Sequence, residues 1–186
     1  MPKDQYKRSA LKQTFIAIEK KALIPLNTEL VQINKIESHD FVFRYLKTKE
    51  PEHIKPLYPN HNPFMPWDKN LEIAEINDKH MLILNKYPVQ FGHMLLITKQ
   101  WVPQTNWLDE SDFKAIKTVD QDTQGLWFYN SGREAGASQE HRHIQLLPRN
   151  TNELYCPRND WFKKNIDQNN QHLFNKSIFI KKRLLN

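Results

Sequence analysis

Apolar and polar residues alternate at two different periods along the chain. Apolar positions recur at helical spacing over residues 9–23, which predicts an N-terminal helix with Ser9 as its N-cap. Residues 29–36 and 40–47 alternate apolar and polar side chains, as strands that bury one face do. Five prolines stand between residues 51 and 66, a density that excludes a helix or central strand and predicts a long loop.

The centre of the chain predicts most of a sheet. Strand-like runs with short connectors predict an antiparallel meander over residues 71–76, 80–87 and 93–99. The next segment predicts a helix over residues 110–123 that ends at Gly125. Its N-cap is Asp109 or Ser111. Two further strands are expected over residues 126–131 and 141–148. These elements predict an α+β fold with an antiparallel sheet of about five strands and flanking helices.

We expect residues 1–186 to form a single domain, because a domain usually has roughly 100–200 residues. Within it, residues 51–66 are the proline-rich loop and residues 150–186 are a short C-terminal extension. The extension is polar and rich in asparagine, with a candidate helix near residues 159–169 and an apolar, basic end.

Composition limits the location and the partners of the protein. No window approaches the roughly 20 apolar residues of a membrane helix, and the first residues lack the apolar stretch of a secretory signal. The single cysteine, Cys156, excludes an internal disulfide, so we expect a cytoplasmic protein without membrane contact. The 27 Lys and Arg against 21 Asp and Glu give a net charge of +6, which suits a polyanionic partner. Charge alone does not choose between nucleic acid and a small polyphosphate.

Three polar side chains share one face of the strand predicted at residues 141–148. The period of two places His141, His143 and Gln145 on that face at intervals of about 7 Å. A neutral imidazole is a good nucleophile toward phosphorus when one neighbour fixes its tautomer and others neutralise the phosphate oxygens. The segment therefore predicts nucleotidyl transfer, with His143 as the nucleophile.

The loop before this strand, residues 130–140, contains two of the four glycines of the chain, Gly132 and Gly136. Glycine permits a positive φ and a close backbone approach, so successive N–H groups can surround phosphate oxygens. Two other interpretations of the histidines stay open, namely polar residues on a solvated strand and a zinc or iron site. The glycines, the serines of the loop and Gln145 favour the phosphate site, and a metal site lacks an obvious third ligand.

The segment GASQEHRHIQLLP resembles the active-site segment of the ATP adenylyltransferases, also called diadenosine tetraphosphate phosphorylases. This family belongs to the branch of the histidine-triad superfamily that includes galactose-1-phosphate uridylyltransferase. The resemblance implies that His143 is the nucleophile, that His141 holds the geometry of the site and that Gln145 binds the nucleotidyl phosphate. Residues 62–148 carry further similar segments, among them LILNKYP and YNSG. By resemblance the nucleotide- and phosphate-binding residues are Asn85, Lys86, Asn130, Ser131, Gly132, Gly136, Ala137, Ser138 and Gln139.

The resemblance also implies a histidine-triad-like fold and a reaction. The expected enzyme cleaves diadenosine tetraphosphate with phosphate to ADP and ATP, and runs the reverse, through an adenylyl-histidine, with Mg²⁺ bound through the nucleotide. The expected partners are these nucleotides and not nucleic acid, and the oligomeric state is open. Another transferase or hydrolase of the superfamily, and a nonenzymatic nucleotide- or RNA-binding protein, are the alternatives.

Two features depart from the family pattern. Glu140 stands where the family usually has proline, which adds negative charge beside a phosphate site. Family members usually continue well beyond the position of Asn186, so the chain is expected to lack the usual C-terminal portion.

Overall fold

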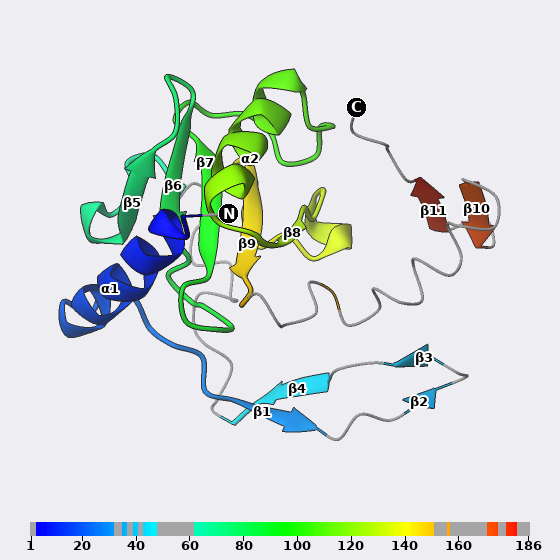
Figure 1. Ribbon diagram of the computed structural model, residues 1–186, viewed down its shortest axis with the longest axis horizontal. Helices are drawn as coiled ribbons and strands as arrows, with labels where there is room; N and C mark the ends of the chain where they lie inside the picture. The colour runs from blue at the N-terminus through cyan, green and yellow to red at the C-terminus, as the bar shows by residue number, and fades with distance from the viewer. Residues whose placement is uncertain are drawn as a thin grey trace. The chain divides into compact units, whose positions relative to one another are not determined.

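A computed structural model describes residues 3–31, 35–36, 39–40, 43–47, 62–150, 156, 171–174 and 178–181 (Figure 1). The chain divides into two compact units: Met1–Thr28 with Leu46–Asn152, and Glu29–Tyr45 with Glu153–Asn186. The single domain over residues 1–186 stays a prediction. No helix within the described ranges is both long and apolar enough to cross a bilayer.

A five-stranded antiparallel sheet forms the first unit, which confirms the α+β fold and the predicted meander. Its strands in chain order are β5 (Glu72–Glu75), β6 (His80–Leu84), β7 (Met94–Thr98), β8 (Gly125–Phe128) and β9 (His143–Pro148). The spatial order is β5-β6-β7-β9-β8, so β9 lies inside the sheet between β7 and β8. All residues of β6 and β7 are buried and form the centre of the core.

Helix α1 (Gln5–Glu19) and helix α2 (Glu110–Asp122) contact each other and lie in front of the sheet in Figure 1. The predicted start of the first helix at Ser9 is wrong, because α1 begins four residues earlier. Its first N–H groups are satisfied by the end of α2, since the Tyr6 amide donates to Asp122 Oδ1 at 2.9 Å. The Lys7 amide likewise donates to Thr123 Oγ1 at 3.1 Å. These partners are distant in sequence, so the pattern of one helix does not reveal them.

Helix α2 begins where the sequence predicts. Asp109 is its N-cap and forms a capping box with Asp112, so Asp109 is confirmed and Ser111 lies inside the helix. The helix ends at Asp122, whereas Gly125 is the first residue of β8. A Cβ at Gly125 would collide with the Leu147 carbonyl oxygen on β9. Glycine is required there for close packing of strands, not for ending the helix.

The other sheets are short. The pair β1 (Thr28–Val31) and β4 (Phe43–Leu46) and the antiparallel pair β2 (Lys35–Ile36) and β3 (His39–Asp40) fall in the two segments predicted as strands. Residues 32–34 and 41–42 of those segments lie outside the described residues. Strands β10 (Gln171–Phe174) and β11 (Ile178–Lys181) form a third pair. The candidate helix at residues 159–169 and residues 51–61 of the proline-rich loop lie outside the described residues.

Candidate active site

His143 opens strand β9 with its imidazole buried at 4 % exposure. Its Nδ1 lies 2.8 Å from the carbonyl oxygen of His141, which can only accept a hydrogen bond. Nδ1 therefore carries the hydrogen, and Nε2 keeps the lone pair needed for attack on phosphorus. Burial lowers the pKa of His143, and the neighbouring His141 lowers it further against the opposing hydrogen bond. The ring is thus a neutral imidazole of defined tautomer.

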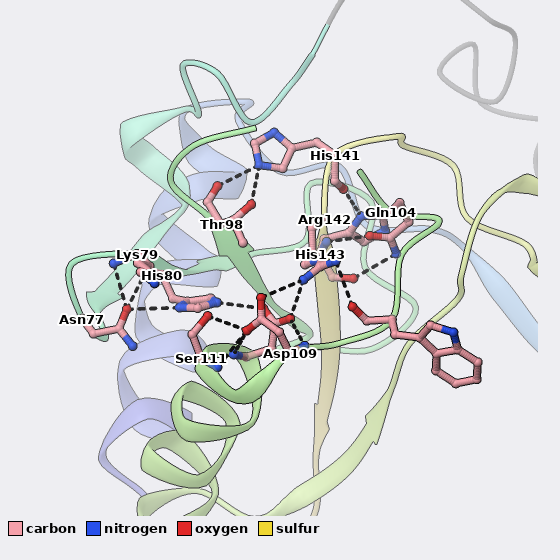
Figure 2. Close-up of polar contacts among 12 residues, drawn as sticks. Asn77, Lys79, His80, Thr98, Gln104, Asp109, Ser111, His141, Arg142 and His143 are labelled. Atoms are coloured by element: carbon pink, nitrogen blue, oxygen red, sulfur yellow. Dashed lines mark hydrogen bonds and ion pairs between the residues drawn. The ribbon is translucent and has the colours of Figure 1, made fainter. Parts of the chain in front are cut away.

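His141 lies just before β9, in an isolated bridge with Pro103, and its ring is held on two sides. Its Nε2 is 2.8 Å from the Thr98 carbonyl oxygen and 2.9 Å from Thr98 Oγ1 (Figure 2). Because the carbonyl only accepts, Nε2 donates, and Nδ1 accepts from Asn62 Nδ2 at 2.9 Å. Burial lowers the pKa of His141. His141 is therefore oriented by the protein and has no nitrogen left for a metal.

Gln145 shares the face of His143, as predicted, and its side-chain oxygen is already in use. Gln145 Oε1 lies 3.1 Å from His93 Nε2, while His93 Nδ1 lies 3.3 Å from Asn85 Nδ2. Burial lowers the pKa of His93 to about 4, so this ring is neutral and donates from Nε2. With its oxygen occupied, Gln145 presents its amide N–H groups as donors. Asn85 thus reaches the site through His93 and Gln145.

Gln104 is a site residue that the sequence analysis missed. Its side chain is 1 % exposed and its Oε1 accepts from the His143 amide at 2.8 Å. Its Nε2 donates to the carbonyl oxygens of His143 at 3.1 Å and of Asn130 at 2.8 Å. One side-chain amide therefore fixes the backbone of His143 to the start of the glycine loop. Gln104 lies in a connector that has no pattern of apolar residues, so only the folded structure reveals its contacts with His143.

The loop between β8 and β9 has the predicted glycine conformations, with φ of 81° at Gly132 and 89° at Gly136. A short 3₁₀ turn, η3 (Arg133–Ala135), lies between them. The N–H groups of Gly136 and Ala137 donate to loop carbonyls at 2.9 Å and 3.0 Å. These two groups stabilise the loop itself, which differs from the predicted use of their N–H groups to surround phosphate.

A cavity of about 420 Å³ lies beside this loop. Its volume is in the range of small-molecule sites. His143 is not among the described residues that line it, but Gln104 is, and Gln104 contacts the His143 backbone. The lining of the cavity includes Trp101, Gln104, Gly132, Arg133, Gln139 and Glu140.

Other predicted residues have separate contacts. The Ser131 hydroxyl donates to the Thr105 carbonyl at 3.2 Å at the rim of the cavity. The Lys86 ammonium lies 5.6 Å from the Tyr87 ring, and the Lys86 carbonyl accepts from Ile24. Phe64, which the sequence analysis did not single out, packs against the His141 and His143 rings at 5.5 Å between centroids. Phe64 contributes to the desolvation that keeps both rings neutral.

A five-stranded antiparallel sheet with two helices, and a His-x-His-x-Gln segment entering its inner strand β9, defines a histidine-triad-like α+β protein. The family model described as the Ap4A phosphorylase N-terminal domain matches residues 1–164. The chain belongs to that family.

Two yeast proteins are similar to the chain in sequence. The chain is 29 % identical over 130 residues to Protein APA1 of Saccharomyces cerevisiae, a match that covers 54 % of this chain and 40 % of that protein. It is 33 % identical over 100 residues to diadenosine 5',5'''-P1,P4-tetraphosphate phosphorylase 2 of the same yeast, which covers 46 % of this chain and 31 % of the relative. The matched segments therefore span less than half the length of either relative.

Solved structures share the fold. Yeast Ap4A phosphorylase Apa2 in complex with Ap4A superposes with a TM-score of 0.69 at 21 % identity, covering 97 % of this chain and 62 % of Apa2. The same enzyme in complex with AMP gives a TM-score of 0.68 at 22 % identity, covering 93 % of this chain and 57 % of Apa2.

Proposed function

We propose that the chain carries the nucleotidyl-transfer site of a diadenosine tetraphosphate phosphorylase. His143 Nε2 attacks the α-phosphorus, the bond from this phosphorus to its bridging oxygen breaks, and ATP leaves. An oxygen of inorganic phosphate then attacks the adenylyl-histidine, which yields ADP and restores the neutral imidazole. The observation that carries the proposal is the buried, neutral His143, whose Nδ1 is bonded to the His141 carbonyl so that Nε2 is free to attack.

Donors around His143 suit the charge that develops on the phosphate oxygens. Gln145 offers its amide N–H groups because His93 occupies its oxygen. We assign the phosphate chain to Ser138 and Gln139, with Asn130, Ser131 and Gly132 at the start of the loop. Lys86 acts as a point charge toward the nucleotide and Asn85 orients His93. Gly136 and Ala137 shape the loop through their own hydrogen bonds.

The cavity beside the loop is the proposed place of the leaving nucleotide. Trp101 lines it and is 56 % exposed, so its ring can stack on a base. Arg133 supplies a cation, 3.8 Å from the Glu140 carboxylate, with both side chains mostly exposed. The backbone carbonyl of Glu140 accepts a hydrogen bond from the backbone N–H of Gln104 at 2.8 Å. This bond fixes the backbone of Glu140 at the edge of the cavity. The added negative charge is thus partly compensated by Arg133.

We expect Mg²⁺ to enter with the nucleotide, bound to phosphate oxygens. Across the described parts of the chain, no group of three or more His, Cys, Asp or Glu side chains forms a metal cage. The chemistry of the ion is to neutralise phosphate charge, while His143 and Gln145 act directly on the reacting phosphate.

Product analysis tests the proposal. The protein is incubated with diadenosine tetraphosphate and Mg²⁺, with and without inorganic phosphate, and the nucleotides are separated by chromatography. We expect ADP and ATP only when phosphate is present, and no turnover by His143→Ala. Release of AMP without phosphate would identify a hydrolase instead. Binding without products would identify a nucleotide-binding protein that lacks turnover.

A further inference from the structure

Arg142 stands between the two histidines of the site, but its side chain is directed to the opposite face of the sheet. Its guanidinium is 3 % exposed and lies against the start of α2. Nη1 donates to Asp112 Oδ2 at 2.6 Å, and Nη2 donates to the Trp107 carbonyl at 3.0 Å (Figure 2). Arg142 therefore ties the segment before β9 to the N-terminus of α2.

Asp112 connects this anchor to a third element. Its Oδ2 also accepts from the Asp109 amide at 2.9 Å, and its Oδ1 lies 3.0 Å from His80 Nε2 on β6. His80 Nδ1 lies 3.1 Å from Asn77 Oδ1, which already accepts the amides of Lys79 and His80. Both His80 nitrogens thus face acceptor oxygens. The buried cluster is an Arg–Asp–His chain from β6 through α2 to Arg142.

The peptide bond between His141 and Arg142 links this cluster to the nucleophile. Its N–H, that of Arg142, donates to the Val102 carbonyl at 2.8 Å. Its carbonyl, that of His141, accepts from His143 Nδ1 at 2.8 Å. Because a peptide is planar, the direction of this N–H fixes the direction of the carbonyl. Whatever holds Arg142 in place therefore also holds the acceptor that sets the tautomer of His143.

The cluster is not the arrangement that stability alone would favour. Charged groups are expensive to bury, and an apolar replacement of similar volume is often as stable or more so. Arg142 Nε is buried without a hydrogen-bond partner among the described residues, a further cost. A fixed, planar guanidinium does supply a rigid orientation, because its donors bind in set directions.

We propose that Arg142 is a positioning residue for nucleotidyl transfer. Anchored by Asp112 and His80, it orients the 141–142 peptide so that the carbonyl of His141 holds His143 with Nε2 unprotonated. The inference rests on the proposed function for its kinetic consequence, but its structural part can be tested without substrate.

The structural test is NMR of the whole protein with ¹⁵N-labelled histidine, assigned with single His→Gln variants. In the wild type we expect His143 in one tautomer, with the hydrogen on Nδ1. In Arg142→Met, which keeps the length but removes the guanidinium, the His143 signals shift toward mixed tautomers. In Arg142→Lys, which keeps a positive charge beside Asp112, the shift of the His143 signals is smaller. Val119→Ala, at a fully buried position on α2, is the matched control and leaves the His143 signals unchanged.

The kinetic test measures single-turnover formation of the adenylyl adduct from diadenosine tetraphosphate, beside the Kd for AMP. We expect Arg142→Met to slow adduct formation roughly 10- to 100-fold, because a small misplacement of a reacting group has an effect of that size. The Kd for AMP stays within about twofold, since the lost interaction serves the transition state and not ground-state binding. Arg142→Lys recovers part of the rate, whereas Val119→Ala, matched for loss of thermal stability, keeps the wild-type rate.

Three results would overturn the inference: mixed His143 tautomers in the wild type, unchanged His143 signals in Arg142→Met, or an unchanged rate in that variant. If Arg142→Met does not fold, the wild-type spectrum and Arg142→Lys still decide. A wild type that forms no adduct counts against the proposed function, while the tautomer measurements still test the role of Arg142.

Discussion

His143, His141 and His93 are three buried imidazoles, and burial lowers the pKa of each. Each also has one tautomer set by its partners: hydrogen on Nδ1 for His143, and on Nε2 for the other two. Three neutral rings close together avoid the mutual repulsion that three imidazolium ions would suffer. The protein itself therefore fixes the protonation state and the orientation of these three rings.

The lowered pKa of His143 predicts that the proposed adenylyl transfer persists at a lower pH than an ordinary histidine would allow. A histidine with its ordinary value of 6.5 would lose half of its neutral form at that pH. We expect the single-turnover rate of adduct formation to stay level as the pH falls through 6.5, and to decline only below it. Diadenosine tetraphosphate is a suitable donor, because it has no terminal phosphate that titrates in this range. A half-maximal rate at or above pH 6.5 would contradict the burial argument.

Some residues of the candidate site follow from the sequence pattern, and others do not. His141, His143 and Gln145 follow from a period of two on one strand, and their shared face is what the structure has. Gln104 and Phe64 do not follow, because their contacts with His143 are made by separate loops brought together by the fold. The same period of two places Arg142 on the opposite face, but its partner Asp112 is identifiable only once α2 is packed on the sheet.

Elements were predicted well where one local pattern specifies them. The five strands of the sheet and α2 follow from apolar periodicity and a capping residue. The start of α1 does not, since its first N–H groups bond to Asp122 and Thr123 at the end of α2. The predicted end of α2 is within one residue of its observed end at Asp122, but Gly125 serves the approach of β8 to β9 and does not end the helix. Contacts between distant segments therefore determine the start of α1 and the role of Gly125.

The N-cap of α2 gives a test at the scale of the element. Asp109 accepts from the amides of Ser111 and Asp112 at 2.8 Å and 3.1 Å. We expect Asp109→Ala to lower the free energy of unfolding by about 1 kcal/mol, the usual contribution of such a cap. Lys117→Ala, at an exposed position of the same helix, is the control and changes it by less than about 0.5 kcal/mol, as surface substitutions do. Urea unfolding of both variants measures the difference, and equal effects would show that Asp109 is not the cap.

The approach of β8 to β9 gives a second test. A Cβ at Gly125 would meet the Leu147 carbonyl oxygen and would lie 2.8 Å from Leu146 Cδ1. Since neither the strand backbone nor a buried leucine can move freely, Gly125→Ala should lower the free energy of unfolding by roughly 1–3 kcal/mol. Thermal unfolding monitored by circular dichroism measures the loss. A variant as stable as the wild type would show that the two strands can separate at little cost.

At the scale of the whole molecule, every proposed site residue lies in one compact unit, that of Met1–Thr28 with Leu46–Asn152. The match to the family model extends over residues 1–164, while the matched segments span 40 % and 31 % of the two yeast relatives. The sheet, the glycine loop and His143 are thus present together in this chain. Its activity on dinucleotides is the proposal to be tested.

The stability of the molecule should depend on pH through His93. The pKa of this buried ring is about 4, whereas an unfolded histidine has about 6.5. As the pH falls below 6.5 the unfolded chain takes up a proton that the folded ring does not, so folding is destabilised. The loss from this group reaches roughly 3 kcal/mol near pH 4 and stops there. Urea unfolding at several pH values should show a dependence near pH 5 that is smaller by one proton in His93→Gln, and identical slopes would contradict it.

Covalent trapping of the nucleophile tests the central claim most directly. The protein is mixed with adenine-labelled diadenosine tetraphosphate and Mg²⁺ without phosphate, quenched in alkali, and analysed by intact mass and peptide mapping, with His143→Ala alongside. We expect one acid-labile adenylyl group per chain, located on His143, lost on addition of phosphate and absent from the variant. Nucleotide binding with no adduct on His143 would contradict the account.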